Sequence, residues 1–320
     1  MTGRWRILAL PPLPKELLEG LFGDERAEVV VPAERTQEAV EALLPDADIV
    51  IGDWSGGLRV DAPGPRVCFV QQPSVGVDAV DLEACTASGV PVANCAGANT
   101  VSVAEWCVSA TLALLRKTVT ADTAVRRGDW PQTEIGGREL AGSTVGVIGM
   151  GPIGVCVARM FGAFDCTVQY WSRSRHDEAP ANYVELDDLV ATSDVIVVVI
   201  ALGPETRRLL DDRRLGLCKP GALLVNGARG EVVDEAALVD ALAAGRLGGA
   251  ALDVFTVEPL PQDAPLRDAP NVLLSPHMAG SSSQAAGRIV GQTTANLRRA
   301  LDGEPVVDVV NAVDAVVRRH

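Results

Sequence analysis

The stretch "TVGVIGMGPIGVCVARMFG" (residues 144–162) places three glycines directly after a β-branched run and at the start of a helical pattern. In such a strand–turn–helix unit, the first glycine makes the tight turn, the second lets the backbone approach a pyrophosphate, and the third lets helix and strand pack closely. The helix N-terminus faces the anion, and a proline suits its first turn. The stretch therefore predicts a dinucleotide-binding turn, the alternative being a glycine-rich turn without a ligand. The residues expected to contact the cofactor are Gly149, Gly151, Pro152, Ile153 and Gly154.

The rest of the chain repeats this alternation of short β-branched runs and helical periodicity, which indicates parallel sheets covered by helices. The expected strands are residues 5–10, 28–31, 47–51, 67–70, 144–148, 166–170, 195–200, 223–226, 249–253 and 272–274. They are too many for one compact sheet, so we expect two α/β domains. Ser102 with Glu105, and Ser281 with Gln284, have capping-box spacing and predict two long helices that begin near these serines. These helices are either domain connectors or ordinary surface helices.

The composition excludes several classes of protein. The chain has 320 residues, 48% of them hydrophobic and 22% charged, enough for two globular domains. Its net charge of −14 would repel a nucleic-acid backbone. The longest apolar run, residues 195–202, is far shorter than the ~20 residues that span a bilayer, and Pro11 and Pro12 interrupt the start before a signal segment can form. Seven cysteines without a C-x-x-C pair indicate neither a disulfide framework nor a metal site. We therefore expect a cytoplasmic protein with no membrane or nucleic-acid partner.

A second motif, "YWSRSR" (residues 170–175), ends the strand that follows the glycine turn. In a dinucleotide fold, the residue about 20 positions after the turn contacts the adenosine ribose and is usually an acid. By count this residue is Ser172. A serine removes a charge that would repel a 2′-phosphate, and Arg173 and Arg175, with Ser174 between them, supply donors that suit one. The motif predicts an NADP pocket, with NAD as the alternative cofactor if the arginines only solvate a surface loop.

Charged residues also follow three apolar strands. His277 in "LLSPHMAGSS" follows the run 272–274, Arg229 follows the run in "VNGARGEVVDEAAL", and Asp253 and Glu258 follow that in "AALDVFTVEPLP". Open α/β sheets bind their ligands at the carboxyl ends of strands, so these residues are candidates for an active site.

These blocks, the glycine turn and "VQQPSVGVDAVDLEACTASGVPVANCAGANTVSVAE" (residues 70–105) together resemble the D-isomer-specific 2-hydroxyacid dehydrogenase family, in particular its glyoxylate and hydroxypyruvate reductases. The resemblance covers about residues 45–305 and implies two Rossmann-like doubly wound parallel sheets, with a nucleotide domain inserted into a discontinuous substrate domain. The implied bounds are residues 1–98 and 284–320 for a flavodoxin-like substrate domain, and 99–283 for the NAD(P)-binding domain. In this fold, the two capped helices are the segments in which the chain crosses from one domain to the other.

The resemblance also implies catalytic roles for three residues. His277, as the imidazolium, donates a proton to the carbonyl oxygen of a 2-oxo acid while the reduced cofactor delivers a hydride. Glu258 hydrogen-bonds His277 and raises its pKa. Arg229 binds the substrate carboxylate.

Further binding residues are implied in the same way. Asp253 and Thr100 contact the nicotinamide side of the cofactor. The turn of Val75, Gly76 and Val77 presents backbone N–H groups to the substrate carboxylate. Trp54 either lines the entrance of the substrate site or belongs to the core.

The sequence departs from the family pattern at Ser172, which replaces the usual acid and favours NADP. Glu258 stands where formate dehydrogenases have glutamine, and residues 70–80 contain no lysine, which weakens a phosphite-oxidising function. We therefore expect an NADPH-preferring, homodimeric reductase of a small 2-oxo acid, with glyoxylate and hydroxypyruvate as candidate substrates. The alternative is a nucleotide-sensing scaffold on the same fold, which turnover abolished by His277→Ala would exclude as the only role.

Overall fold

The computed structural model describes residues 4–319, which divide into two compact units. One unit runs up to Ala98 and resumes at Ser282, and the other comprises Asn99–Ser281. The chain therefore leaves the first unit once and returns to it once. The assignment of these units as substrate and nucleotide domains stays a prediction.

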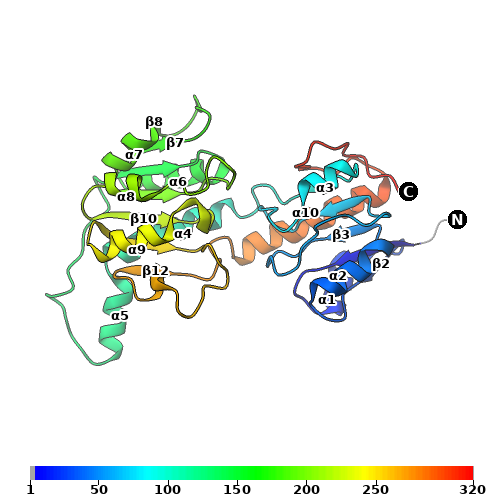
Figure 1. Cartoon of the computed structure of the whole chain (residues 1–320), viewed down its shortest axis with the longest axis horizontal. Coiled ribbons are helices and arrows are strands. Elements are labelled where there is room, and N and C mark those ends of the chain that lie inside the picture. The colour runs from blue at the N-terminus through cyan, green and yellow to red at the C-terminus, as the bar shows by residue number, and fades with distance from the viewer. Residues whose placement is uncertain (1–3, 320) are drawn as a thin grey trace. The chain divides into compact units, whose positions relative to one another are not determined.

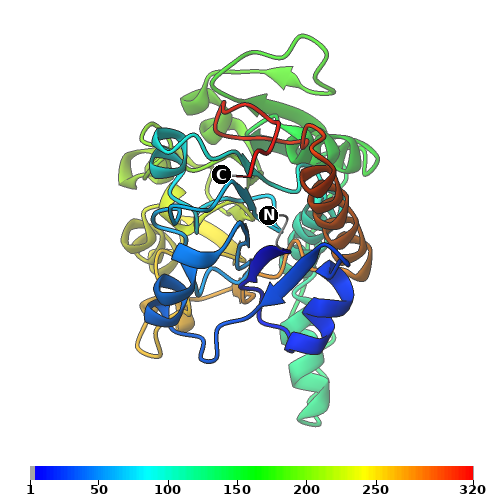
Figure 2. The same cartoon turned by 90° about the vertical axis from the view of Figure 1, so that its right-hand side faces the viewer.

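The first unit is a doubly wound five-stranded parallel sheet with the strand order β2-β1-β3-β4-β5 (Figure 1). Its strands are β1 (Trp5–Ala9), β2 (Ala27–Val30), β3 (Ile49–Ile51), β4 (Phe69–Gln71) and β5 (Val92–Ala93). The apolar side chains of α1 (Lys15–Phe22) and α10 (Ser283–Asp302) pack on one face. The other face is covered by α2 (Gln37–Leu43), the 3-10 turn η1 (Leu44–Asp46) and α3 (Leu82–Ala87). Figure 2 shows these layers from the side of this unit.

The second unit is a seven-stranded parallel sheet with the order β12-β11-β10-β9-β6-β7-β8. Its strands are β6 (Thr144–Ile148), β7 (Thr167–Trp171), β8 (Asn182–Tyr183), β9 (Val195–Val198), β10 (Ala222–Asn226), β11 (Leu247–Leu252) and β12 (Val272–Leu274). One face is covered by α4 (Thr100–Leu115) and α6 (Pro152–Gly162). The other is covered by α7 (Leu186–Thr192), α8 (Asp212–Leu217), α9 (Glu235–Ala243) and the 3-10 turns η2 (Gly230–Val232) and η3 (Pro265–Arg267). Helix α5 (Thr118–Arg126) extends away from this sheet (Figure 1).

The predicted fold class, two parallel α/β sheets, is confirmed. Strands β6 and β12 have the expected bounds, and β7 lies one residue later than expected. The sequence did not predict the two-residue strands β5 and β8, which are too short to show a period.

The helix starts at the two crossings differ from the expectation. Helix α4 begins at Thr100 after Asn99, so Ser102 lies inside the helix and the predicted cap at Ser102 is wrong. Helix α10 is capped by Ser282, whose hydroxyl accepts from Ala285 N at 3.1 Å, one residue after the predicted Ser281. Capping-box spacing therefore indicated a helix near each crossing without fixing its first residue.

Within residues 4–319, no helix combines the length and the apolarity needed to cross a lipid bilayer. All seven cysteines are free thiols.

Candidate active site

Apart from Thr100, the predicted site residues of the second unit follow the carboxyl ends of its strands. Because every strand pair in this sheet is parallel, these ends share one edge. The glycine turn follows β6 at the point where the strand order reverses, which is where open α/β sheets bind ligands. Arg229, Asp253 and His277 follow β10, β11 and β12, which are adjacent in the sheet.

The glycine turn has the geometry of a phosphate cradle. Gly149 has φ +104°, and a side chain there would come within 2.8 Å of the Ile200 Cα. A Cβ on Gly154 would lie 2.0 Å from the carbonyl oxygen of Gly149, so this glycine lets α6 pack on the turn. Gly151 caps α6, and a Cβ there would meet nothing within 4 Å. The protein itself thus requires two of the three glycines, while Gly151 leaves open the space that a pyrophosphate would use.

The loop after β7 is fixed by hydrogen bonds, and its two arginine side chains are exposed to solvent. The Tyr170 hydroxyl, which is buried, accepts from His176 N and donates to His176 O, both at 2.9 Å. The Ser172 hydroxyl donates to Ser174 O at 2.6 Å. Both Arg173 and Arg175 are exposed, and Arg175 lies over the Tyr183 ring at 5.6 Å. Among the described residues, none forms an ion pair or side-chain hydrogen bond with Arg173. The loop therefore presents two cations beside the nucleotide turn.

His277 and Glu258 form a close pair. The Nδ1 atom of His277 lies 2.7 Å from Oε2 of Glu258, and the other carboxylate oxygen accepts from Phe255 N at 2.9 Å. The hydrogen bond to Glu258 raises the pKa of His277 against the opposing effect of burial. Burial raises the pKa of Glu258, but the hydrogen bonds from His277 and Phe255 outweigh it, so the net shift of this carboxyl is downward. The charged form of His277 therefore persists to higher pH than that of an ordinary histidine.

Asp253 organises the loop that carries His277. Its carboxylate is buried and accepts hydrogen bonds from the Ser275 hydroxyl at 2.6 Å, Met278 N at 2.8 Å and Ala279 N at 2.7 Å. The carbonyl of Asp253 accepts from His277 N at 2.8 Å. These contacts hold His277 at φ +52°, a conformation that residues other than glycine rarely adopt. The predicted contact of Asp253 with the nicotinamide stays a prediction.

Arg229 leaves β10 through a turn that the buried Asn226 shapes. The Asn226 side chain accepts from Ala228 N and donates to Arg229 O, both at 3.0 Å. A Cβ on Gly230 would lie 2.0 Å from the Phe255 carbonyl carbon, so only glycine lets the Arg229 turn approach the segment that carries Glu258. The charge of Arg229 lowers the pKa of both Glu258 and His277. Arg229, Glu258 and His277 therefore act on one another electrostatically.

The predicted substrate contacts Val75, Gly76 and Val77 lie in the first unit, on the turn after β4. Their carbonyls are engaged, since Val75 O accepts from Asn94 at 2.7 Å and Gly76 O accepts from the Ser74 hydroxyl at 2.6 Å. Their N–H groups have no acceptor within residues 4–319. Three consecutive N–H groups without acceptors fit the predicted anion nest. Thr100 is the first residue of α4 in the second unit.

Trp54, for which the sequence left two alternatives, is 39% exposed and so does not belong to the core. Its loop is organised by the buried Asp53, which accepts from Arg35 at 2.7 Å and from the Ser55 hydroxyl at 2.7 Å. Gln72 joins this loop to the next turn, because its amide donates to Asp53 O at 3.1 Å and to the Ser74 hydroxyl at 3.0 Å.

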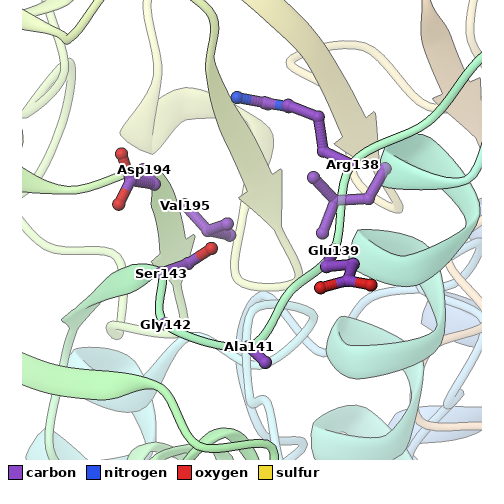
Figure 3. A pocket seen from close by; sticks show the side chains of 8 residues that line it. Arg138, Glu139, Ala141, Gly142, Ser143, Asp194 and Val195 are labelled. Atoms are coloured by element: carbon purple, nitrogen blue, oxygen red, sulfur yellow. The ribbon is translucent and has the colours of Figure 1, made fainter.

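A separate pocket of about 290 Å³ lies at the opposite edge of the second sheet (Figure 3). It is lined by residues at the amino ends of β6 and β9, among them Ser143 and Val195. Of its two acids, Glu139 and Asp194, the latter binds Lys219 at 3.0 Å and Thr144 N at 2.8 Å, and Arg138 donates to Gly221 O at 2.8 Å. Asp194 and Arg138 thus have protein partners, and the pocket is remote from the strand ends that carry His277.

Sequence reasoning missed the residues that shape the loops at the strand ends of each unit. Asp53, Gln72, Asn226 and Ser275 act through contacts that form only once the loops fold back. Gln72 and Asn226 could have been recognised in the sequence, because each is a polar residue at the end of an apolar run.

The family profile described as "D-isomer specific 2-hydroxyacid dehydrogenase, NAD binding domain" matches residues 108–279. The chain is 39% identical over 285 residues to D-3-phosphoglycerate dehydrogenase of Mycobacterium tuberculosis, an alignment that covers 87% of this chain and 54% of the relative. The chain thus spans about half the length of that relative. It is 36% identical over 307 residues to glyoxylate reductase of Aeropyrum pernix, covering 91% of this chain and 88% of the reductase.

Solved structures share the whole fold. The TT0316 protein of Thermus thermophilus superposes with a TM-score of 0.85 at 33% identity, covering 95% of this chain and 99% of that one. An acyclic imino acid reductase in complex with NADPH and D-Arg superposes with a TM-score of 0.83 at 26% identity, with coverages of 95% and 99%.

Proposed function

Because the chain belongs to the D-isomer-specific 2-hydroxyacid dehydrogenase family, we propose that it reduces a small 2-oxo acid to the D-2-hydroxy acid with NADPH. The observation that carries this proposal is the 2.7 Å contact between His277 and Glu258, at the same edge of the sheet as the glycine turn. A scaffold that only sensed nucleotides would not need a histidine with a raised pKa in this place.

The chain's own residues bind the substrate and supply its proton. Arg229 binds the carboxylate of the 2-oxo acid. Bound NADPH supplies the hydride that adds to the carbonyl carbon. His277 donates its Nε2 proton to the carbonyl oxygen, and Glu258 stabilises the charged ring before transfer and fixes its orientation. In the reverse direction the neutral ring accepts the proton of the hydroxyl group.

The cofactor preference rests on the loop after β7. The 2′-phosphate of NADPH would lie beside Ser172, with the guanidinium groups of Arg173 and Arg175 as donors. The absence of a competing acid at Ser172, and of any ion pair to Arg173 among the described residues, supports NADP over NAD. The pyrophosphate would lie on Gly151 at the N-terminus of α6, with Pro152, Ile153 and Gly154 forming the first turn below it.

The substrate proposal is an unphosphorylated acid such as glyoxylate or hydroxypyruvate. The segments 52–58 and 71–78, which include Trp54 and the Val75–Val77 turn, contain no lysine or arginine. A phosphate dianion is normally bound by such side chains, so these segments disfavour a phosphorylated substrate of the kind that the name of the mycobacterial relative indicates.

We also propose that the chain forms a homodimer through helix α5 and the segment that follows it. No side chain of α5 is buried, and Val119, Val125 and Trp130 are 60%, 52% and 77% exposed. Val125 and Trp130 line an open pocket of about 550 Å³. Exposed apolar surface of this kind is typical of an interface, and a second copy would cover it.

The test is a panel of 2-oxo acids assayed with NADPH and NADH, with chiral analysis of the product. We expect D-glycerate from hydroxypyruvate, a higher kcat/KM with NADPH than with NADH, and a lower kcat/KM when the substrate is 3-phosphohydroxypyruvate. Equal use of both cofactors would contradict the proposed preference for NADP. A strong preference for the phosphorylated acid would contradict the proposed substrate.

A further inference from the structure

The position of Glu258 depends on a single peptide group. Its Oε2 atom binds His277, while its Oε1 atom accepts from the N–H of Phe255. Without that N–H the carboxylate would lose one of its two hydrogen bonds and could rotate away from the ring, because its side chain is about one-third exposed. The orientation of the segment Phe255–Thr256 therefore decides whether Glu258 faces His277.

This segment is held from two sides by residues that follow Arg229. On one side lies Gly230, where a Cβ would come within 2.0 Å of the Phe255 carbonyl carbon and 2.3 Å of Thr256 N. On the other side Glu235, the first residue of α9, accepts a hydrogen bond from Thr256 N through its Oε1 atom. Glu235 is partly buried, whereas Thr256 is exposed and lies in a loop without other backbone pairing of its N–H.

We propose that Glu235 is a positioning residue for the proton donor, acting through Thr256 and Phe255 on Glu258 and hence on His277. The proposal extends the proposed function, since it names a residue outside the reacting groups that sets the protonation of His277. Glu235 lies in "VNGARGEVVDEAAL", so one segment carries both the substrate-binding Arg229 and the support for Glu258.

The ordinary role of an acid in the first turn of a helix does not account for this contact. Asp234 already caps α9, since its Oδ1 accepts from Ala237 N at 3.3 Å. Glu235 instead reaches Thr256, which lies 21 residues further along the chain. A capping acid would stabilise α9 alone, whereas Glu235 joins α9 to the loop that carries Glu258.

The proposal predicts that the accepting oxygen matters and the charge of Glu235 does not. The charged groups that act on His277 are Glu258, Arg229 and Asp253, and Glu235 is not among them. Glu235→Gln keeps a carbonyl oxygen for Thr256 N, so it should behave as the wild type. Glu235→Ala removes the acceptor and should release the segment.

The experiment is an NMR titration of His277 in the full chain, together with pH profiles of kcat. The chain has three histidines, so the His277 signals can be assigned from the His277→Ala spectrum. The matched control is Asp240→Ala, which removes an exposed acid from the same helix. We expect Glu235→Ala to lower the pKa of His277 and to reduce kcat about 10- to 100-fold at alkaline pH, as misplaced catalytic groups do. Glu235→Gln and Asp240→Ala should leave the titration unchanged.

An unchanged His277 titration in Glu235→Ala would overturn the proposal. An equal shift in Glu235→Gln would also overturn it, because the effect would then come from charge. The titration needs no turnover, so it decides the role of Glu235 even if the wild-type chain fails to reduce any 2-oxo acid, which would refute the proposed function separately.

Discussion

His277 combines two properties that the sequence could indicate only in part. Its place after an apolar strand predicted a catalytic residue, and the structure brings it to 2.7 Å from Glu258. Its φ of +52° and the three hydrogen bonds that the Asp253 carboxylate makes with the surrounding loop were not predictable, because they depend on how residues 275–279 fold back onto β11. A backbone conformation of this kind costs of order 1–3 kcal/mol and is kept where the surroundings enforce it.

At the residue scale, Glu258→Gln should move the alkaline limit of reduction to lower pH. The wild-type carboxylate raises the pKa of His277, so the protonated donor persists as the pH rises. A neutral amide keeps the hydrogen bond but loses the charge, and the donor is then lost at lower pH. The measurement follows kcat/KM against pH for both proteins, in the direction that reduces the oxo acid. Coincident alkaline limbs would mean that Glu258 does not set the protonation of His277.

The cofactor preference is a second property of single residues. Arg173→Ser should lower kcat/KM for NADPH about 10- to 100-fold, the worth of a charge-assisted hydrogen bond, while kcat/KM for NADH changes little. Arg298→Ser, which removes an exposed arginine on α10 in the other unit, is the control for a general loss of positive charge. A parallel loss for both cofactors would indicate that Arg173 does not contact the 2′-phosphate.

At the scale of elements, the glycine turn contains both glycines that the fold requires and a glycine that we expect only the ligand to require. Gly154→Ala should destabilise the fold by about 1–3 kcal/mol, because its Cβ would meet the Gly149 carbonyl at 2.0 Å. Gly151→Ala should leave the melting temperature nearly unchanged, since nothing lies within 4 Å, yet weaken NADPH binding. Calorimetry and fluorescence titration of both variants check this pair. Tight NADPH binding by Gly151→Ala would contradict the assignment of the open space to the pyrophosphate.

Elements with a strong period were predictable and those without one were not. β6 and β12 carry apolar residues between clear turn signals, and their bounds were predicted. Strand β8 is a two-residue edge strand whose pairing is imposed by its neighbour β7. The capping residue of α4 was predicted wrongly, because Asn99 precedes the helix without a side-chain hydrogen bond and no capping pattern marks that position.

At the scale of the whole molecule, the homodimer can be tested through the exposed α5 segment. Trp130→Ser combined with Val125→Ser should shift the mass found by light scattering from dimer to monomer, because both side chains lie in the apolar surface that a second copy would cover. Phe164→Ser, which changes an apolar side chain that is 41% exposed elsewhere in the same unit, should leave the mass unchanged. A wild-type chain that is monomeric at assay concentration would exclude the dimer.

The central claim is that this chain is a reductase whose proton donor is His277. The most direct test measures NADPH oxidation with glyoxylate or hydroxypyruvate by the wild type and by His277→Ala, with NADPH affinity determined for both. We predict turnover by the wild type, equal NADPH affinity, and a rate about 10²- to 10⁴-fold lower in the variant, the usual contribution of general acid catalysis. Tight NADPH binding without turnover by either protein, or an undiminished rate in His277→Ala, would contradict the account.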